Sequence, residues 1–225
     1  MSPKIVLLLL ISLFAIKKGR TQSTIKPYIF TKADSLRGSI TPERAWWDLQ
    51  YYDLSVEVIP DTKTFKGTNL IHYQVLDTSQ LMQIDMQYPM QITIAIQGND
   101  TLKFSKIGKN AYFIQLKSRQ IIGEKEILKL HFEGKPKIAV RPPWDGGVQW
   151  EKDSKGNHFI STSCQELGSS VWWPCKDHMY DEPDSMKISV TVPRGLKDVS
   201  NGRLRKVIEN QNNTTTFEWF VANPI

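Results

Sequence analysis

The sequence has few cysteines and few histidines, and it lacks a long apolar segment. Only Cys164 and Cys175 are cysteine among its 225 residues, which excludes a disulfide-rich scaffold. The four histidines form no His-Glu-x-x-His pattern, and no set of four closely spaced cysteines and histidines is present. These residues therefore encode neither that helical metal-binding motif nor a zinc knuckle.

The first residues have the pattern of an export signal. Lys4 precedes a mostly apolar run from Ile5 to Ile16, and basic and polar residues follow it. Such a run is short for a helix that crosses a bilayer, but its length suits the core of a signal peptide. We therefore predict a cleaved signal peptide at residues 1–22, export to the periplasm, the cell surface or the medium, and no stable membrane span.

The basic excess of the chain is small once that segment is set aside. Lysine and arginine number 29 against 23 acidic residues, which gives a formal net charge of +6. Removal of residues 1–22 lowers this charge by four, because the segment holds four basic residues and no acidic ones. No cluster of lysine and arginine remains that would neutralise a run of phosphates, so the sequence does not predict a nucleic-acid partner.

Alternating hydrophobic residues predict short strands along most of the chain. Residues 23–45 are a polar lead-in that ends in a helical turn, and the Trp46-Trp47 pair after it is expected in the core. Strands are expected near residues 52–59, 65–75, 81–86, 91–96, 101–104, 112–116, 126–132, 188–192, 203–208 and 214–221. Because helical patterns are nearly absent, we predict an all-β domain of antiparallel sheets over residues 46–225.

The segment from Ser161 to Pro193 has the highest density of unusual residues. It joins a Cys-Gln-Glu element, a Trp-Trp-Pro-Cys turn, an Asp-Glu-Pro turn and an alternating strand. Upstream of it, residues 141–147 combine two prolines with two glycines, a composition that often carries function. The two cysteines of the segment lie eleven positions apart, and this spacing leaves a disulfide and two free thiols equally open.

Six short motifs are more specific as an ordered series than each is alone. They are residues 52–58 (Tyr-Asp-Leu-Ser-Val-Glu-Val), 65–68 (Phe-Lys-Gly-Thr), 164–166 (Cys-Gln-Glu), 173–177 (Trp-Pro-Cys-Lys-Asp), 181–183 (Asp-Glu-Pro) and 188–193 (Ile-Ser-Val-Thr-Val-Pro). This series resembles the N-terminal β domain of the aminopeptidase N family, the zinc-dependent gluzincin exopeptidases that include leukotriene A4 hydrolase. The resemblance implies a saddle of twisted antiparallel sheets that forms one wall of an active site.

The resemblance also implies where zinc and substrate bind. Zinc would be the cofactor of the full-length enzyme and would be held by a following catalytic domain, with none bound by this chain. The Cys-Gln-Glu element matches the family element whose side chain holds the free α-amino group of a substrate. We assign this role to Gln165, whose amide oxygen can accept a hydrogen bond from an ammonium group, with Glu166 as its neighbour. No catalytic residue and no metal ligand is assigned.

Two structural alternatives accompany these assignments. Gln165 could instead satisfy backbone groups at a sheet edge, as most buried polar side chains do. Asp177 and the Asp181-Glu182-Pro183 turn are expected to be scaffold, with the acidic residues capping the turn. The series departs from the common family pattern between these two elements, and the sequence leaves open which aspartate has the usual structural role.

These expectations lead to one function and two alternatives. The first is a substrate-anchoring domain of an exported zinc aminopeptidase, whose partners are the N-terminus of a peptide and a C-terminal catalytic domain missing from this sequence. It would be inert alone, as an N-terminal fragment or truncated product, so whether this chain is itself an enzyme stays open. The second is a secreted β-sandwich module that stacks glycans or peptides on Trp144, Trp150, Trp172 and Trp173. The third is an interaction scaffold without chemistry.

Overall fold

The computed structural model describes residues 29–224. The predicted signal peptide at residues 1–22 lies outside the described residues. The β domain belongs to a compact unit that begins at Thr31, and the family-like motifs all lie within it. In the described part of the chain, no helix is long and apolar enough to cross a membrane.

The described elements are mostly strands. The helices are α2 (Lys32–Gly38) and α3 (Pro42–Ala45), and the 3₁₀ turns are η2 (Pro60–Thr62) and η3 (Ser169–Val171). The strands are β1 (Trp47–Ile59), β2 (Thr64–Val75), β3 (Leu81–Asp85), β4 (Gln91–Gln97), β5 (Asp100–Thr101), β6 (Lys103–Ile107), β7 (Ala111–Gln115), β8 (Lys125–Gly134), β9 (Gly147–Lys152), β10 (His158–Ser163), β11 (Ser185–Pro193), β12 (Arg203–Glu209) and β13 (Thr214–Ala222).

The strands form one large sheet and two small ones. The eight strands of the large sheet have the order β12-β13-β11-β1-β2-β8-β4-β5, while β3, β7 and β6 form a second sheet and β9 pairs with β10. The predicted all-β fold is confirmed. One detail differs from the expected antiparallel sheets, because β1 and β11 run parallel from the Tyr51–Ser185 pair to the Glu57–Thr191 pair. Parallel neighbours need a long crossover, and here the chain from β2 to η3 provides it.

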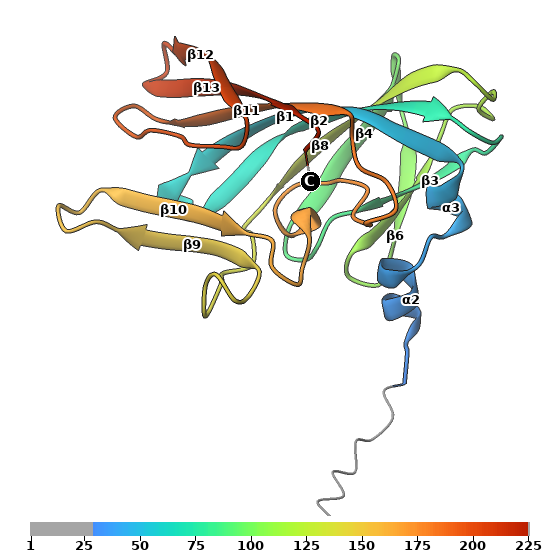
Figure 1. Ribbon diagram of the computed structural model, residues 1–225, viewed down its shortest axis with the longest axis horizontal. Helices are drawn as coiled ribbons and strands as arrows, with labels where there is room; N and C mark the ends of the chain where they lie inside the picture. The colour runs from blue at the N-terminus through green and yellow to red at the C-terminus, as the bar shows by residue number, and fades with distance from the viewer. Residues whose placement is uncertain (1–28, 225) are drawn as a thin grey trace, which may run out of the picture. The chain divides into compact units, whose positions relative to one another are not determined.

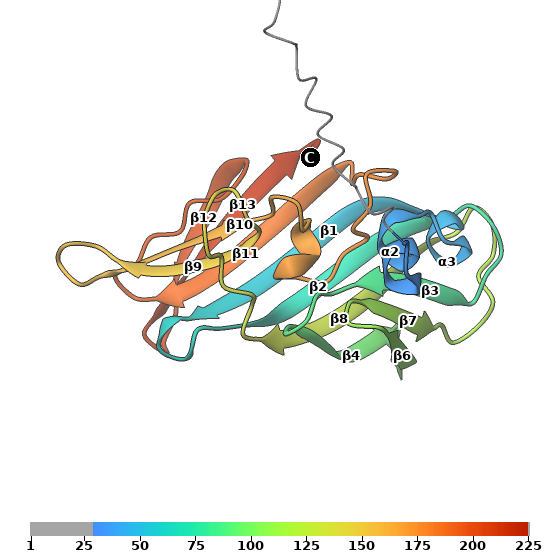
Figure 2. The ribbon, with the colours of Figure 1, turned by 90° about the horizontal axis from the view of Figure 1, so that it is seen from below.

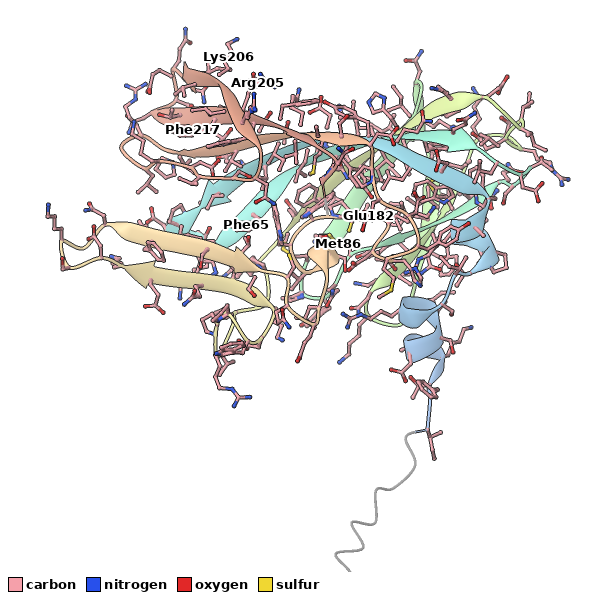
Figure 3. The ribbon with its side chains drawn as sticks, in the orientation of Figure 1. Phe65, Met86, Glu182, Arg205, Lys206 and Phe217 are labelled. Carbon is pink, nitrogen blue, oxygen red and sulfur yellow. The ribbon has the colours of Figure 1, made fainter. Side chains whose placement is uncertain are left out.

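The two small sheets lie on the same face of the large sheet. Figure 1 shows the β9–β10 hairpin below one half of the large sheet and the β3–β7–β6 sheet below the other half, with η3 between them. Figure 2 shows the same arrangement from below. Phe65 of β2 lies between the large sheet and the hairpin in Figure 3, and its ring centroid is 5.4 Å from that of Trp150. The segment around η3 therefore lies between the two small sheets, on one face of the large sheet.

The core lies between these layers and follows the predicted alternation. On β8, the side chains of Leu128, Leu130 and Phe132 are buried while the residues between them are not. Trp46 and Trp47 are 4% and 0% exposed and pack edge-on against the same tyrosine ring, so their predicted core position is confirmed. A period of two thus placed the apolar face of these strands correctly.

The exposed edge of the large sheet is charged. Six of the seven side chains of β12 are exposed, and Figure 3 shows Arg205 and Lys206 on this outermost strand. Charged side chains on an edge strand oppose pairing with the edge of another protein. The charged residues of β12 disfavour such pairing, although Leu204 and Val207 on the same strand are exposed as well.

Gly67 explains why the Phe-Lys-Gly-Thr motif contains a glycine. A Cβ atom at position 67 would lie 2.1 Å from the carbonyl oxygen of Ser55 on β1 and 2.9 Å from the ring of Phe132 on β8. No larger residue fits without moving a neighbouring strand. Close packing within the large sheet therefore requires the glycine of this motif, and the motif does not indicate a binding function.

We predict that Gly67→Ala lowers the free energy of unfolding by about 1–3 kcal/mol, because the added methyl group overpacks the sheet. Chemical denaturation would measure the change. Gly38→Ala is the matched control, since a Cβ atom there has nothing within 4 Å and its backbone needs no left-handed conformation. Equal stability of the two variants would contradict the packing argument.

Candidate functional site

Gln165 and Glu166 lie in the connection between β10 and η3, which we call the anchor loop (residues 164–168). Both residues are exposed. Among residues 29–224, no side-chain or backbone group pairs with the amide of Gln165. This observation goes against the alternative in which Gln165 satisfies backbone groups at a sheet edge, and it leaves the amide oxygen available to a ligand.

The backbone of the anchor loop is closely fixed from within. The N–H groups of Leu167 and Gly168 donate to the carbonyl oxygen of Cys164 at 3.1 and 2.8 Å. Glu166, which lies between Cys164 and Leu167 in this turn, has a left-handed backbone with φ of 62°, an uncommon conformation for a residue with a side chain. Gly146 packs against the loop so tightly that a Cβ atom there would lie 2.7 Å from the carbonyl oxygen of Gln165.

Side chains from distant parts of the chain donate hydrogen bonds to two backbone carbonyl oxygens of the loop, those of Glu166 and Leu167. Arg37 of α2 donates from Nη2 to the carbonyl oxygen of Glu166 at 2.7 Å. Gln87 donates from Nε2 to the carbonyl oxygen of Leu167 and to the hydroxyl of Ser170, the latter at 2.8 Å. The loop backbone is thus anchored while the Gln165 side chain stays free.

Asp177 fixes the end of the anchor loop. Its carboxylate accepts hydrogen bonds from the backbone N–H of Ser170, at 3.2 Å, and from the Ser170 hydroxyl. Gly168 has φ of 73° and ψ of 174°, a region used almost only by glycine, and a Cβ atom there would lie 2.2 Å from Oδ1 of Asp177. The carboxylate therefore caps η3, as the scaffold interpretation of Asp177 expects.

A buried ion pair holds Asp177 in the position from which it caps η3. Arg44 of α3 is fully buried, and its Nη2 lies 2.5 Å from Oδ2 of Asp85 at the end of β3. The same carboxylate accepts the backbone N–H of Asp177 at 3.2 Å, and Gln83 donates to its other oxygen at 3.1 Å. Burial raises the pKa of Asp85, and the Arg44 guanidinium acts in the opposite direction.

A second ion pair lies beneath the Trp-Pro-Cys-Lys-Asp turn. The ammonium group of Lys176 pairs with Asp181, donates to the carbonyl oxygen of Trp47 at 2.6 Å and lies 4.0 Å from the centre of the Trp47 ring. Asp181 also accepts the backbone N–H of Leu49 at 3.0 Å. Burial lowers the pKa of Lys176, which Asp181 partly offsets. Both aspartates that the sequence left undecided are therefore structural, at different points of the segment.

Residues 141–147 form a braced turn beside the anchor loop. The carboxylate of Asp145 accepts the backbone N–H groups of Val140 and Arg141, each at 2.7 Å, and this lowers the pKa of Asp145. The turn leaves Trp144 77% exposed. Ser163 at the end of β10 donates to the carbonyl oxygen of Pro143 at 3.2 Å, which ties the turn to the strand that leads into the loop.

The structure does not form the four-tryptophan stacking surface that the binding-module alternative requires. Trp173 is 6% exposed and packs edge-on against Tyr52, with ring centroids 4.9 Å apart. Trp150 and Trp172 are half-buried against Phe65. Of the four, only Trp144 is exposed, because the rings of the other three pack against Tyr52, Phe65 or each other.

The described residues, 29–224, do not offer a zinc ion a set of grouped ligands. His72 lies on β2, His131 on β8, His158 on β10, and His178 between η3 and β11. Within residues 29–224, no three side chains of histidine, cysteine, aspartate or glutamate are grouped as metal ligands.

The sequence of residues 49–225 matches the peptidase M1 N-terminal domain. The chain belongs to this family. The match spans the large sheet, both small sheets and the anchor loop, so the resemblance seen in the short motifs is confirmed for the domain as a whole. No curated protein matches the sequence.

Solved structures of M1 metallopeptidases share the fold. A variant of the M1 zinc metallopeptidase from Deinococcus radiodurans, bound to a Tyr-Ser-Ala substrate, has a TM-score of 0.65 and 21% identity over 82% of this chain. The M1 zinc metallopeptidase of the same organism has a TM-score of 0.63 and 18% identity over 84% of this chain. Native LTA4 hydrolase from yeast has a TM-score of 0.58 and 14% identity over 85% of this chain. Our chain spans 42% of each Deinococcus chain and 31% of the yeast chain.

The two cysteines are free thiols. Cys175 is buried, and burial raises the pKa of its thiol well above the ordinary value. Cys164 is exposed as a residue, but its thiol is desolvated enough to raise its pKa as well. Of the two possibilities left open by the spacing, the structure shows the reduced one.

We predict that an alkylating reagent modifies Cys164 slowly and Cys175 not at all in the native protein. The thiolate is the reactive form, so a raised pKa slows the reaction at neutral pH and makes it accelerate as the pH approaches 9 and above. Intact-mass measurements should show one slow addition in buffer and two additions in denaturant. Absence of free thiol in denaturant would instead reveal a disulfide.

We also predict that Gly168→Ala destabilises the protein by about 1–3 kcal/mol more than Gly156→Ala, because it adds a steric clash to backbone strain. Both glycines have positive φ, but a Cβ atom at position 156 would meet nothing within 4 Å. The comparison therefore separates the cost at position 168, where the Asp177 contact adds to a glycine-only backbone region, from the cost of a positive φ without a contact. Equal losses, measured by chemical denaturation, would mean that the carboxylate moves away without cost.

Proposed function

We propose that this domain anchors the N-terminal amine of a peptide substrate through Gln165, as part of an exported zinc-dependent aminopeptidase. The observation that carries the proposal is the contrast within the anchor loop. Its backbone is held by Arg37 and Gln87 and by its own turn, while the Gln165 amide stays exposed and without a partner. The held backbone fixes where Gln165 is attached, and the unpaired amide remains available for a ligand.

The amide chemistry of Gln165 suits an ammonium ligand. A peptide N-terminus has three N–H donors, and the amide oxygen of glutamine can accept one of them. A neutral acceptor binds a cation less strongly than a carboxylate does, since charge-assisted hydrogen bonds between two ions are the stronger class. Glu166 is also exposed, and its carboxylate would add attraction for the amine at longer range.

The similar proteins support the same substrate class. One Deinococcus structure contains a Tyr-Ser-Ala substrate, which is a short peptide with a free N-terminus. The zinc of these metallopeptidases would, when bound in a catalytic domain, activate water for hydrolysis of the peptide bond. In our proposal the residues of this chain bind and orient the substrate, and the chain alone has no peptidase activity.

Replacement of Gln165 tests the proposal in a full-length enzyme that contains this domain. Gln165→Leu should lower kcat/KM for aminoacyl reporter substrates by about 10- to 100-fold, because a hydrogen bond to a charged group is lost. Gln165→Glu should retain or strengthen binding of the same substrates. Steady-state kinetics on these reporters would measure both effects.

A matched variant and a matched ligand complete this test. Gln91→Leu makes the same change on an exposed position of β4 and should leave kcat/KM unaltered. A competitive inhibitor that lacks the α-amine should bind the Gln165→Leu variant as tightly as it binds the unmodified enzyme. Full activity of Gln165→Leu, or equal weakening of ligands with and without the amine, would overturn the proposal.

A further inference from the structure

We propose that helix α2 is part of the substrate site and that Arg37 is the positioning residue that sets the direction of Gln165. This inference rests on the proposed function, because it assigns a role in the same amine contact. It starts from the hydrogen bond of 2.7 Å between Nη2 of Arg37 and the carbonyl oxygen of Glu166, which joins residues 129 positions apart.

Helix α2 forms through its own sequence and not through burial. Thr31 and Asp34 make a reciprocal capping box at its N-terminus, in which Thr31 accepts the N–H of Asp34 and Asp34 accepts the N–H of Thr31. No residue of the helix is buried. Apolar packing therefore contributes little to its position, and polar contacts must place it.

Those polar contacts come from the buried ion-pair network. Gln83 donates from Nε2 to the carbonyl oxygen of Leu36 at 3.0 Å. Arg44 donates from Nη1 to the carbonyl oxygen of Ser39 at 2.8 Å, while its Nη2 holds Asp85. The end of the helix that carries Arg37 is thus tied to side chains that are themselves fixed in the core.

A cavity lies next to α2, beside residues that support η3. A cavity of about 260 Å³ is lined by Leu36 and Arg37 of α2 and by Gln87, Ser170 and Asp177. None of residues 164–168 lines this cavity, and the contact between α2 and the anchor loop is the hydrogen bond from Arg37 to Glu166. The loop depends on directed hydrogen bonds, and Arg37 supplies the one at Glu166.

Glu166 is the point at which such a bond has the largest effect. Its φ of 62° is unfavourable for a residue with a side chain and persists only when neighbouring groups hold it. A guanidinium donor makes a strong, charge-assisted hydrogen bond to that carbonyl. If the bond is lost, Glu166 can relax to a negative φ, which rotates the adjacent Gln165 away from its position.

Two measurements on the full-length enzyme test this role. Arg37→Ala keeps a good helix former in α2, so the helix remains while the contact is removed. Hydrogen exchange should become about 3- to 10-fold faster at the amides of Leu167 and Gly168, with peptides from the large sheet unchanged. The KM for aminoacyl reporters should rise by about the same factor with kcat retained, since the contact acts on binding.

The controls use the same helix and the same site. Arg37→Lys retains a donor at this position and should restore part of the protection and of the KM. Lys32→Ala removes the same charge from the exposed first turn of α2 and should change neither quantity. Arg37→Ala combined with Gln165→Leu should be no worse than Gln165→Leu alone, because the two residues act through one contact.

The outcomes separate failure of this inference from failure of the proposed function. If Gln165→Leu raises KM but Arg37→Ala changes neither exchange nor KM, the positioning role is wrong and the amine contact stands. If Arg37→Ala accelerates exchange and leaves KM unaltered in the same enzyme, the contact is only structural. If Gln165→Leu has no effect, the proposed function is wrong, and the proposed role of Arg37 is wrong as well.

Discussion

The buried pair of Arg44 and Asp85 is the interaction on which the rest of the site depends. An isolated charge in the core would be costly, and breaking a buried pair by removing one partner leaves such a charge behind. Here the pair is completed by further bonds, because Asp85 also accepts from Gln83 and from the backbone of Asp177, and Arg44 also donates to Ser39. It therefore joins β3, the lead-in helices and the segment after η3 at one point.

This junction explains how a connecting loop can be rigid without being buried. Asp177, positioned through Asp85, caps η3, and Arg37, positioned through the contacts of Arg44 and Gln83, holds the carbonyl of Glu166. The anchor loop is then held at Glu166 and just beyond its C-terminal end by groups that lead back to one ion pair. The held backbone lowers the cost of ordering the loop when a ligand binds, while the free Gln165 side chain still loses rotamer freedom.

The sequence predicted the elements whose residues alternate and missed those whose residues do not. Strand β8 was expected because Leu128, Leu130 and Phe132 repeat every second residue. Helix α2 buries no residue and so has no apolar period, and the β9–β10 hairpin is mostly partly buried or exposed. Gln165 was assigned its role through a family motif, and that role stays a prediction. Arg37 could not be found, because its contact with Glu166 joins positions 129 residues apart and neither belongs to a recognisable pattern.

The choice of a neutral amide at position 165 fits the electrostatics of its surroundings. The carboxylates of Asp85 and Asp177 are engaged by Arg44 and Ser170, and the acidic side chain next to Gln165 is the exposed Glu166. A carboxylate at the tip of the loop would hold the amine more strongly in the ground state. Equal tightening of substrate and transition state lowers KM without raising kcat, and it also slows release of the amino-acid product, which carries the same amine. In the proposed role, glutamine recognises the amine and still allows turnover.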